Sequence, residues 1–105
     1  MGDRVSISFK NGNDESVALF HHWGGLEFVD LAEEYVAQLP RGEVSMPLDR
    51  REPGTVMVDF IRHITQNMDR VKSSLYLGKD PEDGDNSDNG HFVIDVNQTQ
   101  AMPTN

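Results

Sequence analysis

The sequence predicts an α+β fold: a four-stranded antiparallel sheet with two helices on one face, a two-layer sandwich in the order ββααββ. Three observations support this prediction. Polar and apolar residues alternate near both ends of the chain, the apolar period becomes helical in the middle, and turn-forming residues separate these segments. The 105 residues suffice for one domain, expected over residues 1–97, with a disordered C-terminal tail at 98–105.

Two strands are expected before the first helix. Residues 4–10 alternate, with Val5, Ile7 and Phe9 on one side and polar residues on the other, as in a half-buried strand. Residues 11–14, Asn-Gly-Asn-Asp, are typical of a hairpin turn. Residues 16–22 are therefore expected to return antiparallel to the first strand.

The middle of the chain predicts two helices. After the glycines at 24 and 25, apolar residues recur at helical spacing over residues 28–39. A second stripe follows Pro53, a residue tolerated in the first turn of a helix, and predicts a helix to about residue 69. Residues 40–52 are expected to form a polar connection between the two helices.

Two further strands are expected near the C-terminus. Residues 71–77 and 91–96 alternate in hydrophobicity, which predicts a second hairpin. The helices would then leave one face of the sheet open, and its apolar content suggests pairing with a second copy or a partner. The residues assigned to this face are Ser6, Ser8, Ala18, Phe20, His22, Ser74, Tyr76 and Val93.

Composition excludes several classes of function. The net charge of −9 opposes binding to nucleic acid, because neutralising phosphates requires clustered lysines and arginines. The absence of cysteine excludes disulfides, thiol nucleophiles and thiolate metal sites. No apolar run approaches the ~20 residues of a membrane span, so we expect a cytoplasmic protein without membrane contact. No cofactor is expected.

The most informative stretch is residues 19–28, where two histidines and the single tryptophan precede two glycines. Adjacent strand residues point to opposite faces, so His21 and His22 are not expected to chelate one metal. In one interpretation His21 is hydrogen-bonded at the core edge, Trp23 packs under the first helix, and the glycines form a tight turn. In the other, amides at the helix start bind a phosphate or carboxylate. The candidate ligand-binding residues are Arg4, His22, Trp23, Gly24 and Gly25.

An acidic segment at residues 80–90 is the second candidate site. Residues 85–90 resemble the first half of a calcium-binding loop, with Asp83, Asp85 and Asp88 as candidate metal ligands. An EF-hand is excluded because Val96 stands where a bidentate glutamate is required. The alternatives left open are a solvated acidic loop and a looser Ca²⁺ site.

A third candidate is the pair Asp59 and His63, spaced i, i+4 on the second helix, which permits a hydrogen bond and a general base. A simple surface pair is the alternative, and Arg62 competes for the same carboxylate. The strand serines lack a nucleophile-elbow motif, so a serine hydrolase is not predicted.

The motif Gly2-Asp3-Arg4-x-x-Ile7, followed by His22-Trp23-Gly24-Gly25, resembles a family of small uncharacterised proteins from bacteria, archaea and their phages. Members of that family open with G-D-R and carry H-W-G-G at the end of a second strand. The resemblance implies a prokaryotic or phage setting and transfers no activity. It also suggests that Asp3 or Arg4 interacts with the end of the second strand.

We therefore expect a small non-enzymatic binding or accessory protein, acting through the exposed sheet face or the corner at His22 and Trp23. Its partner would be a second copy of the chain or another protein. The alternative is a small enzyme or anion-binding domain at the Gly24-Gly25 turn. Divalent-metal binding by residues 80–90 is a minor alternative.

Overall fold

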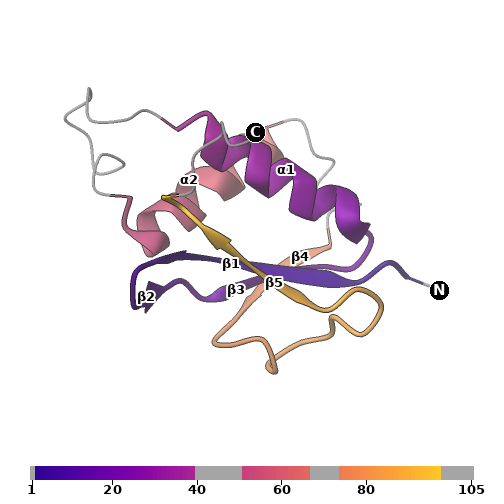
Figure 1. Cartoon of the computed structure of the whole chain (residues 1–105). Helices are drawn as coiled ribbons and strands as arrows, with labels where there is room; N and C mark the ends of the chain where they lie inside the picture. The colour runs from indigo at the N-terminus through magenta and orange to yellow at the C-terminus, as the bar shows by residue number, and fades with distance from the viewer. Residues whose placement is uncertain (1, 40–50, 67–73, 98–105) are drawn as a thin grey trace, which may run out of the picture.

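The computed structural model describes residues 2–39, 51–66 and 74–97. Its elements are β1 (Val5–Asn11), β2 (Asp14–Glu15), β3 (Ala18–His21), α1 (Gly25–Ala37), α2 (Pro53–Thr65), β4 (Leu75–Gly78) and β5 (His91–Asp95). The α+β class is confirmed, and Figure 1 shows both helices on one side of a single sheet. The predicted order ββααββ is wrong by one short strand. The predicted tail at 98–105, and the stretch 67–73 where a helix end and a strand start were expected, lie outside the described residues.

The additional strand arises from a bulge in the predicted first hairpin. Ile7 of β1 pairs with Leu19 of β3, but Lys10 pairs with Glu15 of β2, so the returning chain carries one extra residue between these pairs. Ser16 fills the irregular position, because its amide donates to the Phe9 carbonyl and its hydroxyl accepts from the Phe9 amide. Such a bulge bends the strand and divides it into β2 and β3.

The predicted second hairpin is wrong, because β4 and β5 lie toward opposite edges of the sheet. β4 pairs antiparallel with β3, whereas β5 pairs in parallel with β1 from Ser6–His91 to Lys10–Asp95. β1 therefore lies between β3 and β5, and the sheet is mixed instead of antiparallel throughout. Parallel strands require a crossover connection. Residues 79–90 connect β4 to β5 below the sheet, opposite the helices (Figure 1).

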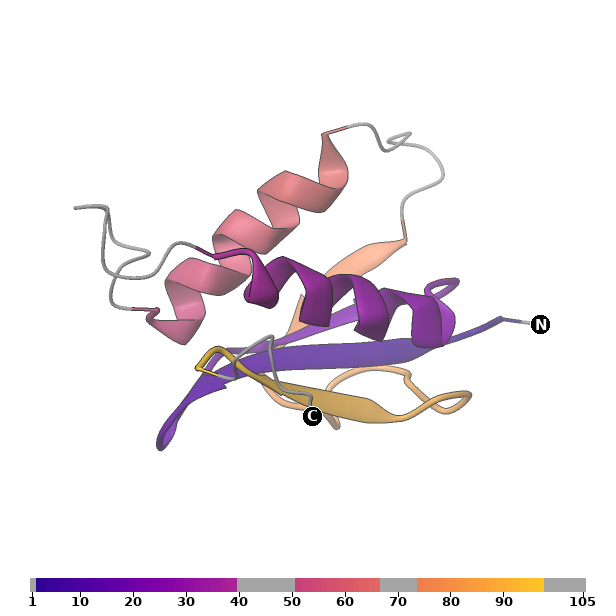
Figure 2. The ribbon, with the colours of Figure 1, turned by 45° about the horizontal axis from the view of Figure 1, so that its top comes forward.

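The helix side of the sheet, the face covered by α1 and α2, holds the apolar core (Figure 2). Val5, Ile7 and Phe9 of β1 are fully buried there, as their alternation predicted. Phe60 of α2 lies at the centre, with its ring centroid 5.4 Å from that of Phe9 and 5.1 Å from that of Tyr35. The apolar stripe of α1 packs into the same core.

The opposite face, called the loop side here, is only partly open: Tyr76 and Val93 are exposed as the sequence suggested, but other residues assigned to it are buried. Ser6, Ser8 and Phe20 are no more than 1% exposed. Residues 79–90 cover Ser6 and Phe20, and Glu15 and His91 lie against Ser8. A Cβ atom added to Gly84 would lie 2.7 Å from the Tyr76 ring, so the backbone of this connection rests directly on the sheet. Tyr76 stacks on Phe20 and is itself 44% exposed.

Candidate functional site

The two predicted motifs meet at one corner of the fold. The Asp3 amide donates a hydrogen bond to the His22 carbonyl, and the Gly25 amide donates to the Asp3 carbonyl, each at 2.9 Å. Residues 2–4 therefore run alongside residues 22–25, beside the start of α1. The expected interaction between Asp3 and the end of the second strand is confirmed.

Close packing explains the glycines at this corner. A Cβ atom on Gly2 would lie 2.6 Å from Nε2 of His22, and one on Gly24 would lie 2.9 Å from both the His21 ring and Phe28. Gly25 has a φ of +62°, a conformation that other residues adopt at a cost. Its α-carbon also faces the Asp3 carboxylate, which leaves no room for a side chain.

Arg4 does not contribute its charge to this corner, because acidic side chains of the crossover connection already bind it. Its Nη1 donates to Asp85 at 2.6 Å, and its Nε donates to Asp88 at 2.8 Å. Hydrogen bonds from Arg4 lower the pKa of Asp88 to about 2. The pKa of Asp85 is also lowered, first by hydrogen bonds from Ser87 and then by Arg4. Arg4 thus fastens residues 85–88 to the start of β1.

The candidate metal ligands are separated by these interactions. Asp85 and Asp88 face Arg4, whereas Asp83 accepts a hydrogen bond from the Asp80 amide at 3.0 Å. Within the described residues, no group of three histidine, aspartate or glutamate side chains is placed to share a metal ion. The geometry gives the proposed calcium site no support.

The two histidines lie in different environments. His21 is half-buried, its Nδ1 lies 3.1 Å from the Ser74 hydroxyl, and its ring meets Phe28 edge-on. Burial lowers the pKa of His21, and the neighbouring His22 adds to this effect. The expectation of a hydrogen-bonded histidine at the core edge is confirmed for His21. The His22 ring instead packs on Trp23, with centroids 4.5 Å apart.

Trp23 is the clearest departure from the structural interpretation of this segment. The sequence suggested that it packs under the first helix, but its side chain is 58% exposed. The backbone turns outward at residues 22 and 23, just before α1 begins at Gly25. Leu26, three residues after Trp23, is 56% exposed. The corner therefore presents two large apolar side chains to solvent.

These two side chains border a depression of about 360 Å³, which we call the Trp23 corner. Asn89 fixes one wall, because its side-chain amide donates to Asp3 at 2.8 Å and to the Arg4 carbonyl at 3.0 Å. The charged groups in the lining are carboxylates, and the aromatic group is the indole. The lining residues are Asp3, Trp23, Gly24, Gly25, Leu26, Glu27 and Asn89.

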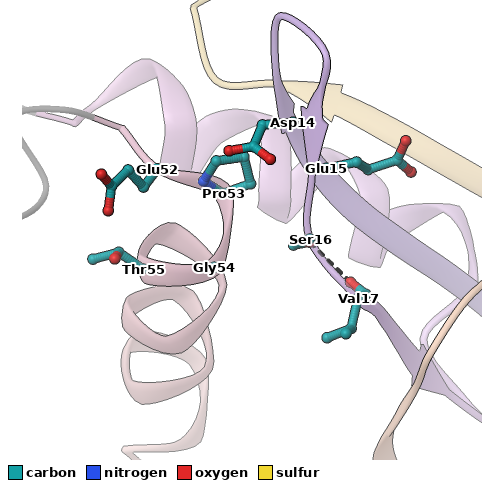
Figure 3. Close-up of a pocket in the computed structure, with 8 residues that line it drawn as sticks. All are labelled: Asp14, Glu15, Ser16, Val17, Glu52, Pro53, Gly54 and Thr55. Atoms are coloured by element: carbon teal, nitrogen blue, oxygen red, sulfur yellow. Dashed lines mark hydrogen bonds between the residues drawn. The ribbon is translucent and has the colours of Figure 1, made fainter.

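A second depression, of about 480 Å³, lies where α2 begins beside the β-bulge, and we call it the α2 depression (Figure 3). It also carries carboxylates, from Asp14, Glu15 and Glu52, but it has no aromatic side chain. Figure 3 shows Asp14 and Glu15 on β2 and Glu52 at the start of α2, with Val17 as the exposed apolar neighbour. The two depressions share a charge sign and differ in their apolar surface.

The sequence did not reveal a buried polar network on the loop side, which we call the Ser6–His91 network. Nδ1 of His91 lies 2.7 Å from the Ser6 hydroxyl, and Nε2 lies 3.2 Å from the Ser8 hydroxyl. Ser8 donates to Glu15 at 2.6 Å, and the Asn86 amide donates to Ser6 at 2.9 Å. If Nε2 of His91 carries the proton, each group donates a hydrogen bond to the next, from Asn86 through Ser6, His91 and Ser8 to Glu15. Every group in the network then has a partner.

This network resembles a hydrolase triad in residue types but not in access. Ser6 is fully buried under residues 79–90, so no substrate reaches its hydroxyl in this conformation. Burial lowers the pKa of His91, and the Glu15 carboxylate acts in the opposite direction. The arrangement satisfies polar groups beneath the crossover connection.

Two further polar residues, Asp59 and Arg51, form hydrogen bonds that support the fold. Asp59, the proposed partner of His63, accepts a hydrogen bond from the Tyr35 hydroxyl at 2.6 Å. Arg51 is 6% exposed and has a φ of +52°. Its guanidinium donates to the carbonyls of Val96 at 2.9 Å and Leu39 at 3.1 Å, which joins the end of α1 to the end of the sheet. No pattern in the sequence distinguished Arg51 from a surface arginine.

The described helices include none that is long and apolar enough to cross a membrane. Comparison of the chain with models of protein families, with curated proteins and with solved structures finds no match.

Proposed function

We propose that this protein is a non-enzymatic binding module that docks a partner through the Trp23 corner. The observation that carries the proposal is the 58% exposure of Trp23 beside the similarly exposed Leu26. Tryptophan is among the residues that contribute most to protein interfaces, because it buries a large area with few rotatable bonds.

The surrounding geometry supports a preformed docking surface. Hydrogen bonds from Asn89, Asp3 and Gly25 join three segments of the chain around the depression. A surface held in this way loses little conformational freedom when a partner binds, and this raises affinity. The exposed sheet face, the other surface expected from the sequence, is a weaker candidate because Ser6, Ser8 and Phe20 are buried.

The alternative of an anion-binding or catalytic site at the Gly24-Gly25 turn has less support. The Asp3 carboxylate lies against Gly25, where an incoming anion would sit, and Glu27 lies in the first turn of α1. Arg4, the cation expected to attract an anion, faces Asp85 and Asp88. An anion would therefore meet two carboxylates and no available positive side chain among the lining residues.

Affinity capture with three matched baits tests the proposal. Trp23→Ala and Leu26→Ala remove apolar surface at the corner, and Val58→Ala removes a 57% exposed side chain on α2 as the control. We expect a partner to be captured by the wild-type and Val58→Ala proteins and lost with the two corner variants. Sedimentation of the same set would detect a second copy as the partner. Identical capture and identical sedimentation for all four proteins would refute the proposal.

A further inference from the structure

We infer that the Trp23 corner accepts a basic side chain, an arginine or lysine of a protein partner, against the indole of Trp23. This inference rests on the proposed function and adds the chemistry of the partner. It is independent of the family resemblance, because it depends only on the charges and rings around the depression.

The lining of the Trp23 corner is negatively charged. Asp3 and Glu27 line the depression, and its lining holds no basic residue. The outward face of α1 continues the same charge, with exposed carboxylates at Asp30 and Glu34. No ion pair joins Glu27 or Asp30 to a basic side chain among the described residues. A cation approaching the corner therefore finds carboxylates that are not already neutralised.

The indole of Trp23 forms an aromatic wall of the depression. A guanidinium or ammonium group over the face of an indole gains cation–π attraction, and a guanidinium also stacks on it. The methylene stem of such a side chain would pack against Leu26, which is 56% exposed. One long basic side chain thus satisfies both the apolar and the acidic parts of the corner.

A basic protein is a better source of the cation than a second copy of this chain. A second copy of the chain carries a net charge of −9, so two copies repel one another at long range. Arg4 and Arg51 are engaged in bonds within the chain. A different, basic protein has the complementary charge, and electrostatic attraction would increase its rate of association.

The test measures binding of a short fluorescein-labelled peptide of alternating glycine and arginine by fluorescence anisotropy, with a glycine–glutamate peptide in parallel. For the wild type we expect binding of the arginine peptide that weakens as salt is added. Trp23→Ala should weaken it about tenfold and Glu27→Gln about twofold to fivefold. The matched control is Asp14→Asn, which removes an exposed carboxylate at the α2 depression and should leave the affinity unchanged.

The outcomes separate this inference from the proposed function. Equal weakening by Asp14→Asn and Glu27→Gln would show attraction to overall charge alone and would overturn the inference. The inference would be overturned if the glutamate peptide bound at Trp23. It would also be overturned if neither peptide bound while partner capture still required Trp23. Both outcomes would leave the proposed function standing. Capture that does not depend on Trp23 would refute the proposed function itself.

Discussion

On its helix side, β1 buries three apolar side chains against α1 and α2, whereas on its loop side it buries Ser6 under residues 79–90 and Ser8 against Glu15 and His91. The first face needs only close packing of aromatic and aliphatic groups. The second must also satisfy each buried hydroxyl, and it does so through His91, Glu15 and Asn86. The burial of β1 therefore depends on close packing on its helix side and on hydrogen bonding on its loop side.

The largest expected effect is on the helix side. Phe60→Ala removes a fully buried ring that contacts three other aromatic rings, and should lower the free energy of unfolding by about 3–5 kcal/mol. Phe20→Ala on the loop side should cost less, about 2–3 kcal/mol, because residues 79–90 can settle into the space. Urea denaturation measures both variants, with Val58→Ala as the exposed control. A larger loss for Phe20→Ala would reverse the comparison.

The next effect is specific to hydrogen bonding. Ser6→Ala removes one hydroxyl and leaves the partly buried Nδ1 of His91 and amide of Asn86 without this hydrogen bond, at a cost of about 1–3 kcal/mol. Denaturation measures the loss, and hydrogen exchange locates it. We expect faster exchange at the amides of Asn89 and Gly90, with α1 amides unchanged as the internal reference. Equal acceleration in α1 would contradict a local role.

The stability of the loop side should depend on pH through His91. Because burial lowers the folded-state pKa of His91, the unfolded chain binds more protons between that value and the ordinary pKa of about 6.5. Stability should therefore fall as the pH drops through this window. His91→Gln should flatten the curve in part, since His21 has a pKa lowered in the same direction. A curve unchanged by His91→Gln would count against this assignment.

A second loss should occur at lower pH, where the carboxylates bound to Arg4 titrate. The pKa of Asp88 is about 2 in the folded protein, below its ordinary value near 4, so stability falls as pH drops from about 4 toward 2. Arg4→Ala should lower the melting temperature and weaken this acid-dependent loss. Added salt should destabilise the wild type more than the variant. An unchanged melting temperature would indicate that Arg4 serves binding instead of folding.

The smallest expected change in stability is at the corner. Trp23→Ala removes a largely exposed side chain and should change the free energy of unfolding by less than about 0.5 kcal/mol. Urea denaturation, followed by circular dichroism because the only tryptophan is lost, measures it. A large loss would mean that the indole supports the fold, and Trp23 would then be a poor candidate for a docking residue.

Periodicity in the sequence was sufficient to locate most elements. Alternation found β1 and β5, and helical spacing found α1 and α2, because each pattern records which side chains meet the core. Pairing between strands was not predictable in the same way. The pattern around His91 marks a strand, but nothing local to it indicates whether β4 or β1 is the neighbour.

The candidate site was predicted in its location and not in its character. The Gly24-Gly25 turn follows from local signals, and its contact with Asp3 was suggested by the family resemblance. The charge of the corner could not be predicted from local sequence, because Arg4 is neutralised by Asp88, which is 84 positions away. Ser6 and Ser8 were assigned to an open face because alternation separates two faces without revealing what covers each of them.

The parallel pairing of β1 with β5 also governs the order in which the chain acquires its structure. Ser6 and His91 are separated by 85 positions, so β1 has no neighbour on one side until the last described strand has been synthesised. A nascent chain that ends before β5 would expose both the loop side and an unpaired edge of β1, a surface prone to association with other chains. Contacts so distant in sequence also slow folding. The pairing of β5 therefore completes the sheet by covering the second edge of β1.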